Sequence, residues 1–249
     1  MQDNQLGKVA LVTGGAKRVG AGVVRFLHAR GWRVLIHYRG SAAAAAALAA
    51  ELNALRPASA ATVQLDLLQT ARLPELVAAA LECFGRLDAV INNASSFFAT
   101  PVGAFTEAAW DELVGSNLKA PLFLAQAAAP ALAHTGGAIV SIADIHVERP
   151  SPGFALYTAA KAGLVAMTRG LARELAPAVR VNAVAPGANL WPENEAVFDD
   201  AERARIEASI PLGRVGGPQD LAQAIHFLLE APYLTGVVLP VDGGRSVVL

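Results

Sequence analysis

The sequence predicts an α/β protein in which helices cover both faces of a doubly wound parallel sheet, and three observations lead to this prediction. Short apolar segments such as residues 8–13 and 138–143 alternate with longer helical patterns over the whole chain, as expected for strands buried on both faces. Loops rich in glycine and asparagine follow several of these segments. No linker or internal repeat divides the chain, so we expect a single domain over residues 1–249.

Composition and charge restrict the partners of this chain. Hydrophobic residues make up 54% of the sequence, and the mean hydropathy is +0.40. Many of them are alanines, which suit close helix packing and a large apolar subunit interface. A net charge of −1 gives no electrostatic argument for nucleic acid or an anionic membrane. Because no apolar run is long enough for a membrane span and residues 1–8 lack a signal-peptide core, we expect a cytoplasmic protein that binds small molecules and copies of itself.

The single cysteine and the histidines do not indicate a metal site. Cys83 alone excludes an internal disulfide and a cysteine metal cluster, and its apolar helical surroundings predict a buried, inert thiol. The five histidines show no metal-ligand spacing, and only His146 is expected near the candidate site. No Gly-x-Ser-x-Gly motif supports Ser-His-Asp hydrolysis.

The first predicted strand, residues 8–13, leads into a glycine turn and a helix that reaches about residue 30. Backbone N–H groups in such a turn and the N-terminus of the helix favour a phosphate. The alternative is a tight turn without a ligand. The candidate cofactor-binding residues of this turn are Gly14, Lys17, Arg18, Val19 and Gly20.

The end of the second predicted strand, residues 32–38, indicates the kind of cofactor. An NAD-specific fold places an acid here for the adenosine ribose, but no Asp or Glu occurs over residues 31–50. Arg39 and Ser41, with Arg18 across the turn, could instead hold a 2′-phosphate. The alternative for Arg39 is a solvated strand-end charge. The sequence therefore favours NADP.

Two further strand ends supply candidate residues. After a predicted helix over residues 42–55, a third strand at 61–65 delivers Asp66 and Leu67, which suit the adenine edge, although a turn-forming Asp is as consistent. After a helix at 73–84, the fourth strand at 87–91 opens into a loop at 92–98. There Asn93 and Ala94 let the backbone pass close to a cofactor, and Phe97 either stacks on a planar ring or packs in the core. A long helical stretch at 106–134 follows, in which Asn117 either kinks or wets the helix beside the site or is exposed.

The central stretch, residues 138–164, contains the candidate acid chemistry. Asp144 leaves the end of the fifth strand, and Tyr157 and Lys161 lie four residues apart on a helix starting near residue 155. They therefore share one helix face. We expect the Lys161 ammonium to favour the Tyr157 phenolate and so to suit Tyr157 to general acid work. The alternative is a half-exposed pair on an ordinary amphipathic helix.

The remaining chain completes the alternation of strands and helices. A strand at 180–184 leads into Pro186 and Gly187 and then a loop with Leu190 and Trp191, which should border the nicotinamide and the substrate. Residues 198–210 are expected to form a lid or substrate-loop helix. A helix at 220–230 and a last strand at 237–241 follow.

The ordered motifs resemble the short-chain dehydrogenase/reductase family over essentially the whole chain. They are Thr13-Gly14 with Gly20, Asn92-Asn93-Ala94, Asn117, Tyr157-x-x-x-Lys161, Pro186-Gly187 and Val241-Asp242-Gly243-Gly244. This resemblance implies a seven-stranded Rossmann sheet, a nicotinamide cofactor, commonly a homotetramer, and a tetrad of Asn117, residue 144, Tyr157 and Lys161.

Two departures make the chain similar to the pteridine reductases of that family. Asp144 stands where typical members have Ser, and Arg18 stands where they have Gly, while residues 92–97 also match the subgroup. The subgroup implies that Arg18 contacts the NADP phosphate, that Ser95 and Phe97 hold a pterin against the nicotinamide, and that Asp144 and Tyr157 supply the acid chemistry. Lys161 is also expected to hold ribose hydroxyls. Substrate choice is expected in the loop at 188–195, where Leu190 and Trp191 are candidate substrate-binding residues. Gly40 departs from the Arg of these reductases.

The leading functional expectation is an NADPH-dependent pteridine reductase that acts on dihydropterins, including dihydrofolate. A carbonyl reductase of the same family, for instance on 3-oxoacyl thioesters, is the first alternative. A redox-sensing NADP-binding module without chemistry is an alternative from another class.

Overall fold

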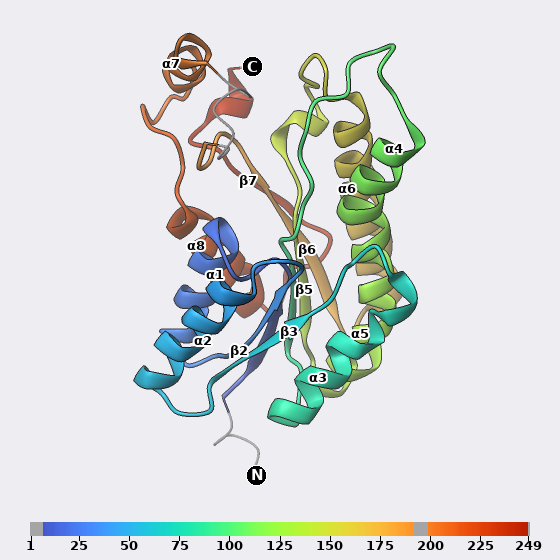
Figure 1. Cartoon of the computed structure of the whole chain (residues 1–249), viewed down its shortest axis with the longest axis vertical. Helices are drawn as coiled ribbons and strands as arrows, with labels where there is room; N and C mark the ends of the chain where they lie inside the picture. Colours follow the sequence, from blue (N-terminus) through green and yellow to red (C-terminus); the bar gives the residue numbers. More distant parts are fainter. Residues whose placement is uncertain (1–6, 192–198, 249) are drawn as a thin grey trace.

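The computed structural model describes residues 7–191 and 199–248, and in these ranges seven parallel strands form one sheet in the order β3-β2-β1-β4-β5-β6-β7 (Figure 1). The strands are β1 Val9–Val12, β2 Arg33–Tyr38, β3 Ala60–Gln64, β4 Ala89–Asn92, β5 Ala138–Ile142, β6 Arg180–Pro186 and β7 Val238–Val241. The helices are α1 Arg18–His28, α2 Ala42–Leu55, α3 Pro74–Phe84, α4 Glu107–Val114, α5 Ala120–Thr135, α6 Ala155–Leu175, α7 Asp200–Ala208 and α8 Pro218–Glu230. The predicted doubly wound parallel sheet is confirmed.

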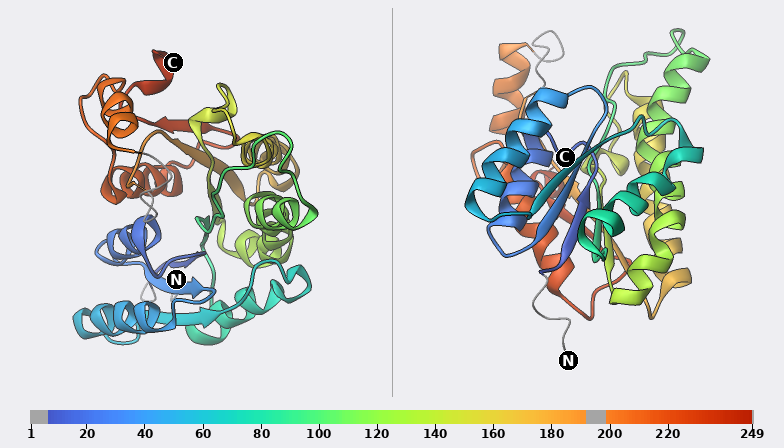
Figure 2. Two further views of the ribbon diagram at one scale, coloured as in Figure 1. Left: turned by 45° about the horizontal axis from the view of Figure 1, so that its top comes forward. Right: turned by 60° about the horizontal axis from the view of Figure 1, so that its bottom comes forward.

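Helices cover both faces of the sheet. Helices α1, α2 and α8 lie on one face, and α3, α4, α5 and α6 lie on the other (Figures 1 and 2). Strand β1 shows why both layers form, because Ala10 and Val12 belong to one hydrophobic cluster while Val9 and Leu11 belong to the other. All four side chains are fully buried. Among the described helices, none is both long and apolar enough to cross a bilayer.

The strand order determines where a ligand can bind. The chain runs outward from β1 through β2 to β3, and then outward from β4 in the opposite direction. The connections after β1 and β4 therefore leave the sheet on opposite sides and open a crevice at its carboxyl edge. The loops after β5 and β6 begin at the same edge.

The long helix expected at 106–134 is interrupted by a π-helical turn at Gly115–Lys119 between α4 and α5. The backbone N–H of Ala120 donates to the Gly115 carbonyl, five residues back instead of four. Thr106 caps the start of α4 by accepting a hydrogen bond from the Ala109 N–H. Asn117 therefore lies in a widened turn, which is a backbone form often found at functional sites.

The prediction that Cys83 is buried is wrong. Helix α3 turns Leu76, Val77, Ala80 and Phe84 into the core, and Cys83 lies in the last turn, beyond the edge of that stripe. Its thiol is exposed. The sequence pattern was misleading because every neighbour of Cys83 in the last turn is apolar or acidic, which leaves the buried face undefined there.

Candidate active site

Two adjoining cavities at the carboxyl edge of the sheet contain nearly all of the candidate residues. The first has a volume of about 460 Å³ and is lined by the predicted cofactor-binding residues Gly14, Lys17, Arg18, Val19, Gly20, Arg39, Asp66, Leu67, Asn93, Ala94, Lys161, Pro186 and Gly187. The second has a volume of about 800 Å³ and is lined by the predicted substrate-binding residues Ser95, Phe97, Asp144, Tyr157, Leu190 and Trp191. Both cavities are bordered by Arg18, Ser95, Asp144 and Tyr157. Ser41 and Asn117 line neither.

The glycine turn after β1 is held tightly against the sheet. Gly14 has a φ of +60°, and a Cβ atom at Gly20 would lie 2.2 Å from the Gly14 carbonyl oxygen. The Gly14 N–H donates to His37 Nδ1 at 3.1 Å. The Asn93 amide donates to the carbonyl oxygens of Thr13 at 2.7 Å and Gly14 at 3.0 Å. The predicted cofactor-binding residue Asn93 therefore also fixes the turn that starts α1.

The start of α1 fits the phosphates of a dinucleotide. Lys17 is the N-cap and makes no side-chain capping bond, and the first turn of α1 contains no acidic residue. Glycine at positions 14 and 20 allows close packing there, since an added Cβ atom would lie 3.1 Å from Ala94 Cα or 2.2 Å from the Gly14 carbonyl oxygen. A helix start without a capping side chain, the positive end of the helix and a neighbouring lysine together favour an anion.

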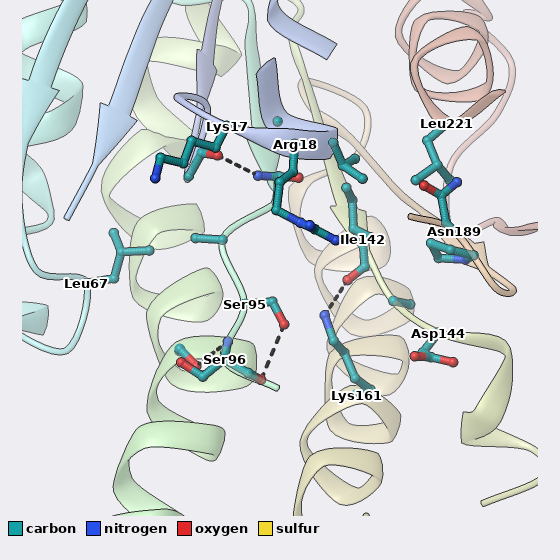
Figure 3. Close-up of a pocket in the computed structure, with 18 of the residues that line it drawn as sticks. Lys17, Arg18, Leu67, Ser95, Ser96, Ile142, Asp144, Lys161, Asn189 and Leu221 are labelled. Atoms are coloured by element: carbon teal, nitrogen blue, oxygen red, sulfur yellow. Dashed lines mark hydrogen bonds between the residues drawn. The ribbon is translucent and has the colours of Figure 1, made fainter. Parts of the chain in front are cut away.

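Arg18 links the glycine turn to the loop after β6. Its guanidinium donates to the carbonyl oxygens of Leu190 at 3.0 Å and Trp191 at 2.8 Å, and its backbone has a φ of +52°. The left-handed conformation costs a residue with a Cβ atom about 1–2 kcal/mol, which explains why a glycine suits this position. The sequence placed Arg18 at a phosphate; the structure places its guanidinium at the border of the two cavities (Figure 3). Residues 192–198, which include the first residue of the expected 198–210 segment, lie outside the described part of the chain.

Arg39 has an acidic partner that the sequence did not indicate. Its guanidinium forms an ion pair with Glu112 of α4, with 3.0 Å between Nη1 and Oε1. The same Glu112 oxygen accepts a short hydrogen bond from the Ser96 hydroxyl. This carboxylate competes with any phosphate for Arg39. Ser41, the other candidate for the phosphate, is the N-cap of α2 and makes no side-chain capping bond.

Asp66 forms a turn, one of the two roles that the sequence left open, and it also lines a cavity. Its carboxylate accepts a hydrogen bond from the Leu68 N–H at 3.0 Å, which forms a local turn. Asp66 and Leu67 also line the first cavity. The turn therefore presents both residues to a ligand there.

Asn117 is buried and forms hydrogen bonds to the loop after β4. Its side chain is 1% exposed, which excludes the expected alternative of a solvated residue. The amide donates to the carbonyl oxygens of Leu113 and Ser96, each at 2.9 Å. Its own oxygen accepts a hydrogen bond from the Ser95 hydroxyl at 2.8 Å. The structure thus places Asn117 as a positioning residue for Ser95 and Ser96.

Asp144 joins Tyr157 and His146 in one hydrogen-bonded group. The Tyr157 hydroxyl donates to Oδ2 at 2.9 Å. Oδ1 accepts two bonds from His146, one from the backbone N–H and one from Nδ1, each at 2.8 Å. Lys161 does not join this group directly, because its ammonium donates to the Ile142 carbonyl at 2.7 Å (Figure 3). Asp144 and Tyr157, the two residues expected to supply the acid chemistry, are thus in direct contact.

Burial and the carboxylate of Asp144 oppose the effect expected of Lys161 on the Tyr157 phenol. Burial raises the pKa of Tyr157 well above its ordinary value, and the charge of Asp144 and the bond to it raise it further. Burial lowers the pKa of Lys161 to about 8, although Asp144 partly opposes this. Burial of Asp144 disfavours its ionised form, but hydrogen bonds from His146 and Tyr157 outweigh this and hold its pKa below the ordinary value. Tyr157 is therefore a protonated donor beside an ionised carboxylate.

Phe97 presents a flat surface beside Tyr157 in the second cavity. Its ring stacks on Phe154 with 4.8 Å between centroids and 7° between planes. The Tyr157 ring meets Phe97 edge-on, with centroids 4.9 Å apart. Phe154 therefore covers one face of the Phe97 ring, while Phe97 as a whole stays 39% exposed in the wall of the second cavity.

Three charged residues of the second cavity were not found from the sequence. Glu202 and Arg205 come from α7, a helix within the predicted 198–210 segment, and they line the second cavity. Arg245 comes from the chain after β7. Their place in the site depends on how the last third of the chain folds back over the sheet, for which local sequence patterns give no signal.

A parallel sheet whose crevice holds a glycine turn, an Asn-supported loop and a buried Tyr-Lys pair is the construction of a dinucleotide-binding oxidoreductase. Residues 14–246 match the family model described as enoyl-(acyl carrier protein) reductase. The chain is 38% identical to pteridine reductase 1 of Leishmania tarentolae, over 96% of each chain. It is 39% identical to the granaticin polyketide synthase putative ketoacyl reductase 2 of Streptomyces violaceoruber, over 95% of each, and 36% identical to 3beta-hydroxysteroid dehydrogenase 1 of Eggerthella lenta, over 99% of this chain and 96% of that one.

This chain belongs to the short-chain dehydrogenase/reductase family. Members of this family use nicotinamide cofactors, and the chain is accordingly an oxidoreductase that acts on small molecules.

Proposed function

We propose that this protein is an NADPH-dependent pteridine reductase that reduces C=N bonds of dihydropterins. The observation that carries the proposal is the hydrogen bond between Tyr157 and Asp144, which lies between the two cavities and beside Phe97. The similarity to a pteridine reductase over almost the whole chain supports it.

The residues of the first cavity would hold the cofactor. The glycine turn and Lys17 would bind its phosphates, and Lys161 would bind the nicotinamide ribose hydroxyls. When bound, the nicotinamide supplies the hydride. Arg39 and Ser41, together with the lack of an acid after β2, support a 2′-phosphate and hence NADPH.

The residues of the second cavity would orient the pterin and move the proton. A pterin stacked on Phe97 would have its reactive ring held in place, which removes much of the cost of orientation. Reduction at carbon leaves negative charge on the adjacent ring nitrogen. Tyr157, which its surroundings keep protonated, would give its proton to that nitrogen, and Asp144 would hold the hydroxyl in position.

The first experiment follows NADPH oxidation by the purified protein with dihydrobiopterin, dihydrofolate and an acetoacetyl thioester in parallel. We expect turnover of the pterins and a clear preference for NADPH over NADH. Turnover of the thioester alone would contradict the proposal.

A ketoreductase is the second candidate, because a ketoacyl reductase and 3-oxoacyl-[acyl-carrier-protein] reductases are among the similar proteins. The substitution Asp144→Ser separates the two candidates, since typical members of the family have Ser at this position. A pteridine reductase should lose most pterin turnover in this variant, whereas a ketoreductase should keep its ketone turnover. Full pterin reduction by the variant would count against the proposed role of Asp144.

A further inference from the structure

Arg245 is a buried cation in the wall of the second cavity. It starts a single helical turn, Arg245–Val247, directly after the left-handed Gly244. Only 7% of Arg245 is exposed, and its side chain lines the second cavity. The short segment after β7 therefore places a guanidinium inside the site instead of on the surface.

The described residues offer hydrogen-bond partners to only part of this guanidinium. Its Nε donates to the Ser209 hydroxyl at 3.0 Å, and Nη1 lies 3.5 Å from His146 Nε2. A guanidinium has five N–H donors. Among the described residues no carboxylate forms an ion pair with Arg245, whereas Arg205 on the same wall is paired with Glu202 at 2.8 Å. Burial lowers the pKa of Arg245, as does the charge of Arg205, and the more distant Asp144 and Asp242 oppose this.

A buried, unpaired arginine is costly unless an anion completes its surroundings. The anion would lie on the side of Arg245 that faces His146. The Nδ1 of His146 donates to Asp144, and its Nε2 faces Arg245. The imidazole thus stands between the reacting end of the cavity and Arg245. A ring placed against Tyr157 would extend its substituent past His146 towards the guanidinium.

We propose that Arg245 anchors a subsite for a carboxylate on the substituent of the substrate ring. The subsite rests on the proposed function for the position of the ring, but its recognition chemistry is independent of the reaction. Arginine binds a carboxylate with paired, charge-assisted hydrogen bonds. The enzyme would therefore prefer pterins with an anionic substituent, such as a carboxylate, to pterins with a neutral, hydroxylated one.

The test compares the binding of two matched pterins, pterin-6-carboxylate and 6-hydroxymethylpterin, to the protein with NADP⁺ by pterin fluorescence. We expect the wild type to bind the carboxylate at least about tenfold more tightly. Arg245→Gln should abolish this preference, and Arg245→Lys, which keeps the charge, should retain part of it. Arg205→Gln is the matched variant, and because its charge is already paired it should keep most of the preference.

Equal affinity of the wild type for both pterins would overturn the subsite. The subsite would also be overturned if Arg245→Gln lost the same amount of affinity for both pterins, because Arg245 would then act only through His146. If neither pterin binds, the proposed function fails, and the subsite is then tested by thermal shift with acetoacetate and its methyl ester. Stabilisation by the acid alone that depends on Arg245 would support the subsite, and equal stabilisation or none would overturn it.

Discussion

Asp144 lies in direct contact with the hydroxyl of Tyr157. Its charge and its hydrogen bond raise the pKa of Tyr157, in addition to the effect of burial. We predict that Asp144→Asn lowers the pKa of Tyr157, since the negative charge beside the phenol is removed. A near-ultraviolet absorbance titration measures this shift, and Tyr157→Phe identifies the signal by abolishing it. An unchanged titration would show that burial alone sets the pKa.

Removal of the Tyr157 hydroxyl should slow pterin turnover and leave NADPH binding unchanged. General acid groups contribute about 10²- to 10⁴-fold to a rate, so Tyr157→Phe should reduce pterin turnover by a factor in that range. NADPH affinity, measured by fluorescence titration, should stay close to that of the wild type. Tyr233 is fully exposed, and Tyr233→Phe is the matched control, in which turnover should not change. Wild-type turnover in Tyr157→Phe would exclude this tyrosine as the acid.

At the scale of elements, the contact between β1 and α1 should be sensitive to one methyl group. A Cβ atom at Gly20 would lie 2.2 Å from the Gly14 carbonyl oxygen, so Gly20→Ala must displace the start of α1. We expect a destabilisation of about 1–3 kcal/mol and a loss of NADPH binding. Thermal unfolding and fluorescence titration measure the two effects.

Gly170 provides the control for this substitution. It lies in α6, and an added Cβ atom there would meet nothing within 4 Å. Gly170→Ala should therefore stabilise the protein by about 0.5–1 kcal/mol and leave NADPH binding intact. Equal behaviour of the two variants would mean that the turn after β1 adapts to a side chain.

We expect the ion pair between Arg39, directly after β2, and Glu112 of α4 to affect how strongly the protein prefers NADPH to NADH. Glu112 occupies Arg39, so Glu112→Gln should strengthen NADPH binding and hardly change NADH binding. Arg39→Gln should weaken NADPH binding about tenfold or more, because a charge-assisted contact to the 2′-phosphate is lost. The ratio of kcat/KM for the two cofactors is the measurement. A ratio that neither variant changes would remove Arg39 from the cofactor site.

At the scale of the whole molecule, we predict that four copies of this chain assemble. The family resemblance motivates this expectation, and exposed apolar side chains occur on α4 and α5, with Trp110 52% and Phe123 40% exposed. Light scattering should give about four times the chain mass of 25.7 kDa. Trp110→Glu should lower this mass if α4 lies in an interface. A wild-type mass equal to one chain would refute the assembly.

The sequence predicted local structure and the edge of the sheet that carries the site, because both follow from local patterns. The alanine-rich run at 42–55 is α2 with the same bounds, and Asp144 and Tyr157, which the family resemblance grouped together, form a hydrogen bond. It did not predict that Glu112 would reach Arg39, 73 residues away, or that Arg245 would enter the second cavity. Contacts of this kind depend on how distant elements pack, and no periodicity reports them.

The π turn between α4 and α5 has a consequence for chain length. Because its hydrogen bond spans five residues instead of four, the turn contains one more residue than an α-helical turn. A chain shortened by one residue here would form a continuous α-helix on the same core. It would no longer hold an amide behind the loop after β4. Deletion of one residue here should therefore keep the fold but remove the hydrogen bonds that hold the loop after β4.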